Sequence, residues 1–224
     1  VTRHQALEDV VMTDVSAFTL GYETAVEVAP NQYEAGHFSP LIERNTVIPV
    51  SRSQPISTIH KGQSEIRLQV FQGESPFTRD NVKIGELDVK VPANKQAHEE
   101  VEVRFTYDTS GLLEVEAKVI STGKAYTAVF QGGAGSMSED DVQRRLKELS
   151  HLKIHPREEA ENTALMSRLS AIYQNALGND RDQIAHLIQH FEAALHTQDK
   201  RVIAEAREDV ATHIKRFEDH DVFT

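Results

Sequence analysis

The sequence contains no cysteine and no tryptophan, and aromatic residues make up only 6% of its 224 positions. Without cysteine there can be no disulfide, thiolate zinc site, iron–sulfur cluster or cysteine nucleophile. This usage is compatible with a reducing compartment, and we expect a cytoplasmic protein. No stretch approaches the roughly 18 consecutive apolar residues that a membrane helix needs, so we expect no membrane partner.

An excess of positive charge is also missing, because 24 Lys and Arg residues face 35 Asp and Glu residues, for a net charge of −11. The imbalance is even: residues 1–133 carry 12 basic and 18 acidic side chains, and residues 134–224 carry 12 and 17. Nucleic-acid surfaces need clustered Lys and Arg, so no nucleic-acid partner is expected. The chain begins at Val1 without the layout of a secretory signal, which suggests that an upstream segment is missing.

Glycine and proline become scarce in the last part of the chain. Six of the seven prolines and ten of the eleven glycines lie at or before position 135. Strands need turns at short intervals, whereas long helices exclude both residues from their interiors. The shift predicts a β part followed by an α part, with the joint at residues 132–135.

Apolar and polar residues alternate in the first part, over residues 66–70, 101–107 and 113–119. This period predicts strands with one buried and one solvated face, as in antiparallel sheets. The turn residues at 108–111, which end in glycine, predict a hairpin between the last two strands. Several short strands of this kind are typical of an antiparallel β-sandwich or barrel.

Helical spacing replaces the alternation in the second part. Apolar residues recur every three or four positions over residues 142–152, 165–176, 184–195 and 202–217. This spacing predicts four amphipathic helices with short connections, which form a small bundle.

Two histidine pairs, at 151/155 and 186/190, have the i, i+4 spacing of metal ligands on a helix. Neither pair has an intervening glutamate or an evident third ligand, so solvated histidines are the favoured interpretation. The acidic pairs at 140–141 and 158–159 suit helix N-termini, which attract negative charge, better than acid catalysis. We therefore predict no catalytic residue and no metal ligand.

Five short stretches carry a family resemblance. They are DVVMTDV at 9–15, FTLGYET at 18–24, LIERNTVIP at 41–49, QGE at 72–74 and SEDDV at 138–142. In this order and spacing, and followed by a change from β to α, they resemble the 70-kDa heat-shock chaperone family of the DnaK type. The resemblance covers nearly the whole chain.

The resemblance implies the substrate-binding part of an ATP-regulated chaperone. Residues 1–13 would be a remnant of the interdomain linker, residues 14–133 a peptide-binding β-sandwich of two four-stranded sheets, and residues 134–224 a helical lid. The ATPase domain is absent, so the chain itself would be no enzyme and would hold no cofactor, ATP and Mg²⁺ belonging to the missing domain. Implied partners are extended hydrophobic segments of unfolded proteins, the chain's own nucleotide-binding domain and a J-domain co-chaperone, in a stress response.

Positional match with the family assigns roles to individual residues. The apolar pocket for one client side chain would be lined by Tyr22, Ile56, Ile66, Leu68 and Val101. Two residues would form an arch over the peptide, Ala25 and Ile59, and three would make polar contacts with it, Thr24, Ser57 and Gln63. The linker that docks on the ATPase domain would include Val10, Val11 and Met12, and this strand or the groove could also support self-association.

Several departures from the family pattern point to a divergent, specialised bacterial member similar to HscC. The segment between Thr24 and Leu41 is longer than the corresponding loop, and Gln96 and Lys61 stand where the family latches its lid. The enlarged loop at 25–40 leaves open a second interpretation, an interaction scaffold for one folded partner. A β-sandwich carbohydrate hydrolase is a third, but the lack of tryptophan argues against it.

Overall fold

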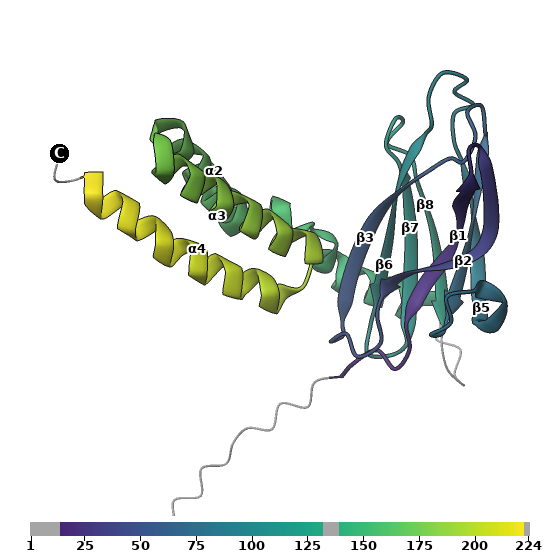
Figure 1. The fold of residues 1–224 in the computed structure, drawn as a ribbon. Coiled ribbons are helices and arrows are strands. Elements are labelled where there is room, and N and C mark those ends of the chain that lie inside the picture. Colours follow the sequence, from purple (N-terminus) through teal and green to yellow (C-terminus); the bar gives the residue numbers. More distant parts are fainter. Residues whose placement is uncertain (1–13, 132–138, 222–224) are drawn as a thin grey trace, which may run out of the picture. The chain divides into compact units, whose positions relative to one another are not determined.

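The computed structural model describes residues 14–131 and 139–221, and these residues divide into two compact units (Figure 1). The first unit extends to Lys153 and the second begins at Ile154. The predicted linker remnant at 1–13, with Val10, Val11 and Met12, lies outside the described residues, as does the predicted joint at 132–135.

Within residues 14–131, the first unit contains eight antiparallel strands in two sheets. They are β1 (Leu20–Ala29), β2 (Gln32–Ile42), β3 (Val50–Ser57), β4 (Glu65–Gln72), β5 (Val82–Lys90), β6 (Glu100–Tyr107), β7 (Leu112–Val119) and β8 (Ala125–Gln131). One sheet has the order β2-β1-β4-β5 and the other the order β3-β6-β7-β8. Figure 1 shows the strands of this sandwich unit. The prediction of a sandwich of two four-stranded sheets followed by helices is confirmed.

The core of the sandwich lies between the sheets and follows the alternation of the sequence. On β6, Val101, Val103 and Phe105 are fully buried, and on β7 every second residue from Leu113 to Val119 is buried with them. Such burial removes water from one face of each strand, which is the main stabilising term in a sandwich. The alternation therefore predicts the correct buried face of β6 and β7.

The turn between β6 and β7 is the predicted hairpin. The Asp108 carboxylate accepts hydrogen bonds from the backbone N–H groups of Ser110 and Leu112, each at 2.9 Å. Gly111 has a φ of 82°, a conformation that costs glycine little because it has no Cβ. The local sequence thus specifies this turn completely.

The segment predicted as an enlarged loop at 25–40 is a long β-hairpin, so that part of the prediction is wrong. β1 continues to Ala29 and β2 begins at Gln32, with Asn31 at a φ of 61° in the turn. The pairing of β1 with β2 shifts register between Thr24 and Val26 and again between Glu27 and Ala29. Each such bulge interrupts the two-residue period that would have identified the strands from sequence.

One helix and one short turn follow the strands within the sandwich unit. They are α1 (Glu139–Leu149) and the 3₁₀ turn η2 (Ser150–Lys153). The Lys153 ammonium lies 2.8 Å from the Glu114 carboxylate and 3.6 Å from that of Glu116, both on β7. These ion pairs attach η2 to the sheet, so the start of the predicted lid packs with the sandwich.

The helical unit contains a 3₁₀ turn and three helices: η3 (Pro156–Glu158), α2 (Ala160–Asn175), α3 (Gly178–Thr197) and α4 (Lys200–Asp221). Its core includes Leu169, Ile184, Phe191, Val210 and Ile214, each 0% exposed. These positions follow the predicted helical spacing, so this unit has an apolar core of its own.

Candidate functional site

The site begins where β1 separates from β4. The ladder between these strands contains three pairs within the described part of the chain, Leu20 with Gln72, Gly21 with Phe71 and Tyr22 with Val70. Beyond Tyr22, β1 continues to Ala29 paired with β2 alone, while β4 remains paired with β5 back to Glu65. The separation leaves an open edge on β1 between Tyr22 and Ala29. An open edge of this kind can pair with another extended strand.

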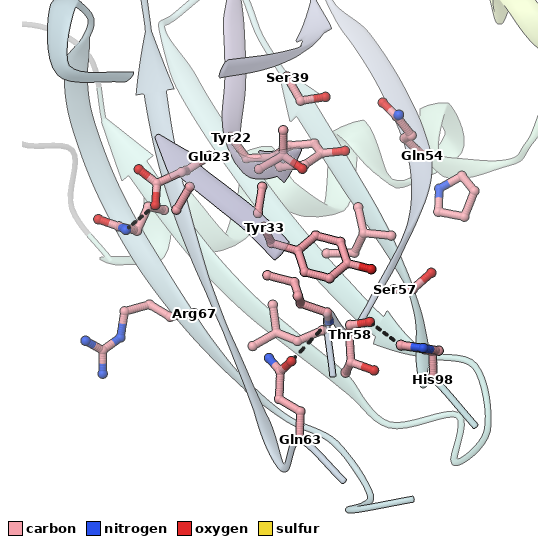
Figure 2. A pocket seen from close by; sticks show the side chains of 18 residues that line it. Tyr22, Glu23, Tyr33, Ser39, Gln54, Ser57, Thr58, Gln63, Arg67 and His98 are labelled. Atoms are coloured by element: carbon pink, nitrogen blue, oxygen red, sulfur yellow. Dashed lines mark hydrogen bonds between the residues drawn. The ribbon is translucent and has the colours of Figure 1, made fainter. Parts of the chain in front are cut away.

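A pocket of about 710 Å³ opens at this separation. We call it the groove. Its walls come from β1 and β2 on one side, from β3 and the turn after it on the other, and from β4 (Figure 2). The volume lies within the range of roughly 300–1,000 Å³ that is usual for ligand pockets.

The structure brings eight of the ten predicted peptide-binding residues to this one groove. They are Tyr22, Thr24, Ala25, Ile56, Ser57, Ile59, Gln63 and Ile66. The two predicted arch residues, Ala25 and Ile59, come from β1 and from the turn after β3, so they lie on facing walls.

Leu68 and Val101 do not line the groove, which corrects their predicted place in the pocket. Leu68 is 2% exposed and Val101 is 0% exposed, both within the core of the sandwich. Leu68 shares a face with Ile66 but lies two residues nearer to the part of β4 that is still paired with β1. Val101 lies on β6, which is flanked by β3 and β7. Both side chains therefore lie in the core between the two sheets.

The floor of the groove is apolar. Ile56 and Ile66 are partly buried and pack against the core, and each exposes the rest of its side chain to the groove. Tyr22 is 3% exposed, and its ring meets Phe105 edge to face with centroids 6.4 Å apart. Burial raises the pKa of the Tyr22 hydroxyl above its usual value of 10.0, while a hydrogen bond with Ser39 opposes the shift. The hydroxyl is therefore protonated at neutral pH.

The wall after β3 is held by its own hydrogen bonds. The Gln63 amide oxygen accepts from the backbone N–H groups of Ile59 at 3.1 Å and His60 at 3.4 Å, and its nitrogen donates to the Glu65 carbonyl at 2.6 Å. Both ends of this amide are thus used within the turn. Gln63 therefore shapes the wall, and the second N–H of its amide is the donor that could make the polar peptide contact implied by the resemblance.

Further hydrogen bonds hold Thr58, which lies next to that turn. The Thr58 backbone N–H donates to the Glu99 carbonyl, and the Glu99 N–H donates to the Thr58 hydroxyl, both at 3.0 Å. The His98 ring donates from Nδ1 to the Thr58 carbonyl at 2.7 Å. Thr58 is only 4% exposed, so this wall is fixed to the rest of the sandwich.

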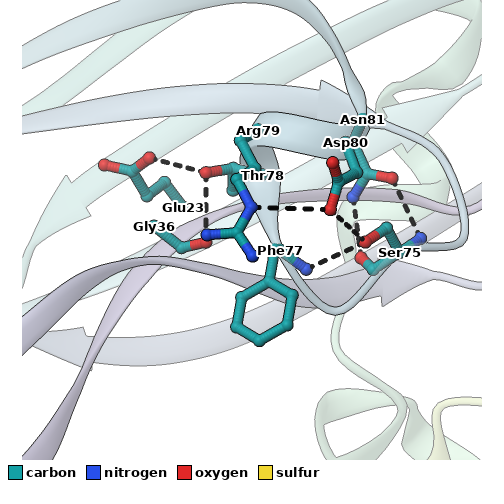
Figure 3. A network of polar contacts seen from close by, with 8 residues as sticks. All are labelled: Glu23, Gly36, Ser75, Phe77, Thr78, Arg79, Asp80 and Asn81. Atoms are coloured by element: carbon teal, nitrogen blue, oxygen red, sulfur yellow. Dashed lines mark hydrogen bonds and ion pairs between the residues drawn. The ribbon is translucent and has the colours of Figure 1, made fainter.

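Glu23 contributes a carboxylate that sequence reasoning did not single out. Gln69 donates to one of its oxygens at 3.1 Å, and the Thr78 hydroxyl lies 2.9 Å from the other. Thr78 belongs to the 3₁₀ turn η1 (Thr78–Asp80), and its hydroxyl also lies 3.2 Å from the Gly36 carbonyl on β2. Figure 3 shows the contacts of Thr78 with Glu23 and Gly36. Neutral donors therefore hold a negative charge at the groove.

Sequence reasoning also missed Tyr33 and His98, which line the groove from β2 and from the segment before β6. A resemblance could not supply Tyr33, because it lies in the lengthened hairpin. Among the described residues, no group of three or more His, Cys, Asp or Glu side chains could hold a metal ion. Within the same residues, no helix has the length and apolar character needed to cross a membrane.

Comparison with known proteins finds one family over nearly the whole chain. The family model described as Hsp70 protein matches residues 1–222. The chain is similar to the chaperone protein DnaK of Thermosipho africanus, with 28% identity over 204 residues, 86% of this chain and 32% of that protein. It is also similar to the chaperone protein DnaK of Thermotoga petrophila, with 32% identity over 161 residues, 71% of this chain and 25% of that protein.

A third relative, the chaperone protein DnaK of Thermosipho melanesiensis, is 32% identical over 162 residues, 72% of this chain and 26% of that protein. The chain thus spans about a quarter to a third of the length of these relatives. The family match and the sandwich-then-helix fold agree with each other. This chain belongs to the Hsp70 protein family.

Proposed function

We propose that this chain is the substrate-binding part of an ATP-regulated molecular chaperone, and that it binds extended hydrophobic segments of unfolded proteins in the groove. The observation that carries the proposal is the juxtaposition of an open strand edge on β1 with an apolar floor of Ile56 and Ile66. An extended peptide can add to such an edge through its backbone, which every client shares, and can place one apolar side chain on the floor.

The energetics favour moderate affinity and loose sequence selection. Full burial of one leucine side chain contributes about 1.5–3 kcal/mol. A micromolar complex needs about 8 kcal/mol. Backbone hydrogen bonds and flanking contacts must supply the difference. Since backbone contacts are common to all sequences, many apolar segments should bind with similar affinity.

The remaining parts of the proposal are supported by family membership alone. ATP and Mg²⁺ would act in a nucleotide-binding domain that this chain does not include, and this chain would hydrolyse nothing. Its partners would be that domain, through the linker residues Val10, Val11 and Met12, and a J-domain co-chaperone. We place the protein in the cytoplasm, in a stress response, as a specialised member similar to HscC. The helical unit would act as the lid.

The test is peptide binding by fluorescence anisotropy, with labelled heptapeptides that carry a central leucine. We expect micromolar binding by the wild type and a loss of at least about tenfold for Ile66→Phe, because the larger ring overfills the floor. Val82→Phe is the matched control, since Val82 is 66% exposed on β5 and does not line the groove. Equal affinity of Ile66→Phe and wild type would contradict the proposal.

A second candidate function is a scaffold for one folded partner, bound by the hairpin at residues 25–40. It is favoured by the exposed apolar side chains of Val26 and Val28, which are 44% and 59% exposed. Scanning a library of immobilised peptides separates the two functions. Binding to many apolar heptapeptides supports the chaperone, and binding to none supports the scaffold.

A further inference from the structure

Two aromatic rings to which the family resemblance assigns no role meet where the hairpin approaches the turn after β3. Tyr33 on β2 and His60 in the turn after β3 pack edge to face, with centroids 5.9 Å apart and ring planes at 83°. Tyr33 also lines the groove together with Thr58 and Ile59 of the facing wall. In Figure 2 the Tyr33 ring extends from its strand into the space among the lining side chains. The hairpin wall and the turn wall are therefore in direct contact.

The His60 side of this contact is rigid. The Gln63 amide accepts the backbone N–H of His60 at 3.4 Å, and the Gln63 N–H donates to the His60 carbonyl at 3.3 Å. The Gly62 N–H donates to the Asn94 carbonyl at 2.6 Å, which ties the turn to the segment before β6. His60 is thus presented by a turn whose position is set from two directions.

The Tyr33 side depends on the length of the hairpin. Tyr33 pairs with Glu27, beyond the point at which β1 has left β4, and it lies close to the turn at Asn31. The Glu27 carboxylate also accepts the Asn31 backbone N–H at 3.0 Å, which closes the hairpin tip. Tyr33 is 38% exposed, so its ring can move away from His60 without opening the core.

We propose that Tyr33 and His60 form an aromatic bridge that closes over a peptide in the groove and slows its release. This inference rests on the proposed function and adds a pair of retaining residues to it. A peptide paired with the open edge of β1 would run between the two walls that the bridge joins. Sideways release then requires the ring contact to break, whereas a peptide in an unbridged groove could leave directly.

The test is a double-mutant cycle on the whole chain, read as the dissociation rate of a labelled leucine-centred heptapeptide in stopped flow. An aromatic pair is worth about a twofold to tenfold change in an equilibrium constant. We expect Tyr33→Leu and His60→Leu each to speed release by about threefold to tenfold, and the double variant to be no faster than either single variant. Tyr33→Phe keeps the ring and should release peptide like the wild type.

Val28→Ala is the matched control, because Val28 lies on the same hairpin, is exposed and does not line the groove. A second readout needs no peptide: the NMR signals of the His60 ring protons should shift in Tyr33→Leu and stay in place in Val28→Ala. Unchanged release rates, or additive effects in the double variant, overturn the bridge alone. Failure of the wild type to bind any apolar heptapeptide overturns the proposed function and the bridge with it.

Discussion

The two compact units differ in how completely they bury their apolar side chains. In the helical unit, α2, α3 and α4 enclose one apolar cluster, and residues such as Leu169 and Phe191 are 0% exposed. In the sandwich unit the central residues are just as buried, but Ile56 and Ile66 at one end remain only partly covered. The difference arises because β1 stops pairing with β4 after Tyr22 while the rest of the sandwich stays closed.

This comparison indicates why the proposed binding site lies in the sandwich. A sheet can end one ladder locally and keep its core, since each strand is still paired on its other side. The open half of β1 is still paired with β2, and the open half of β4 is still paired with β5. A helix of the bundle cannot leave its neighbours without exposing its apolar stripe. The sandwich can therefore expose an apolar floor at a smaller cost.

The largest effect should come from removing one large aromatic side chain from each core. Phe105→Ala in the sandwich and Phe191→Ala in the helical unit remove residues that are both 0% exposed. Each should lower the free energy of unfolding of its own unit by about 3–5 kcal/mol, because a cavity remains. Calorimetry should show two transitions, each shifted by one substitution. A single transition shifted by both variants would mean that the units unfold as one.

A smaller effect is expected at the end of the sandwich unit. Lys153→Met removes the ammonium beside Glu114, whose side chain is only 6% exposed. A buried carboxylate without its partner should destabilise the unit by about 1–3 kcal/mol. Hydrogen exchange should become faster in α1 and η2, and the calorimetric transition of the helical unit should not move.

The double variant Lys153→Met, Glu114→Gln is the control for that substitution, because it removes the charge that the first change leaves unpaired. We expect it to recover most of the lost stability. If Lys153→Met alone leaves exchange in α1 unchanged, the ion pair does not hold η2 on the sheet.

Removing the helical unit would test its proposed role as the lid. A chain ending at residue 153 retains the groove and the whole sandwich unit. Peptide release should become faster by about tenfold, while association should change much less, because affinity differences appear mainly in dissociation rates. Stopped flow measures both rates. Equal release rates from the short and the full chain would refute the lid role.

The smallest effect should be a pH dependence of folding stability that arises near the start of β1, where this strand is paired with β4. Glu74 accepts hydrogen bonds from the backbone N–H of Thr19 at 3.0 Å and from its hydroxyl at 2.9 Å. These bonds, the backbone bond first, lower the pKa of Glu74 below its usual value of 4.5. A lowered pKa in the folded state adds stability above the unfolded value, and this stability is lost as the pH falls through the folded value.

Urea titrations at successive pH values measure this contribution. The wild type should lose stability below pH 4.5 more steeply than Glu74→Gln, which has no carboxylate to protonate there. At neutral pH the glutamine variant should be slightly less stable, because its neutral oxygen is a weaker acceptor. Parallel pH profiles of stability for the two proteins would show that the Glu74 carboxylate does not stabilise the fold.

The sequence by itself determined the order of the two parts, the strands β4, β6 and β7, and the four helices. The alternation over β6 and β7 indicates which face of each strand meets the core, and the helical spacing over α2 and α3 does the same for each helix. Each pattern is contained within the sequence of its own element. The turn at Asp108 is specified by its own side chain and by Gly111. Positional match with the family named eight residues that line one groove, because it assigns them places along β1, β3 and β4 and in the turn after β3.

Tertiary structure alone decided where the sandwich opens and what spans the opening. Ile66 and Leu68 have the same period and the same chemistry, but only Ile66 lines the groove, because Leu68 lies two residues nearer to the last pair between β1 and β4, Tyr22 with Val70. Tyr33 and His60 are ordinary in sequence and meet only because the bulged hairpin carries one ring to the other wall. Pairing between distant segments depends on the geometry of both, so no local pattern in either one encodes it.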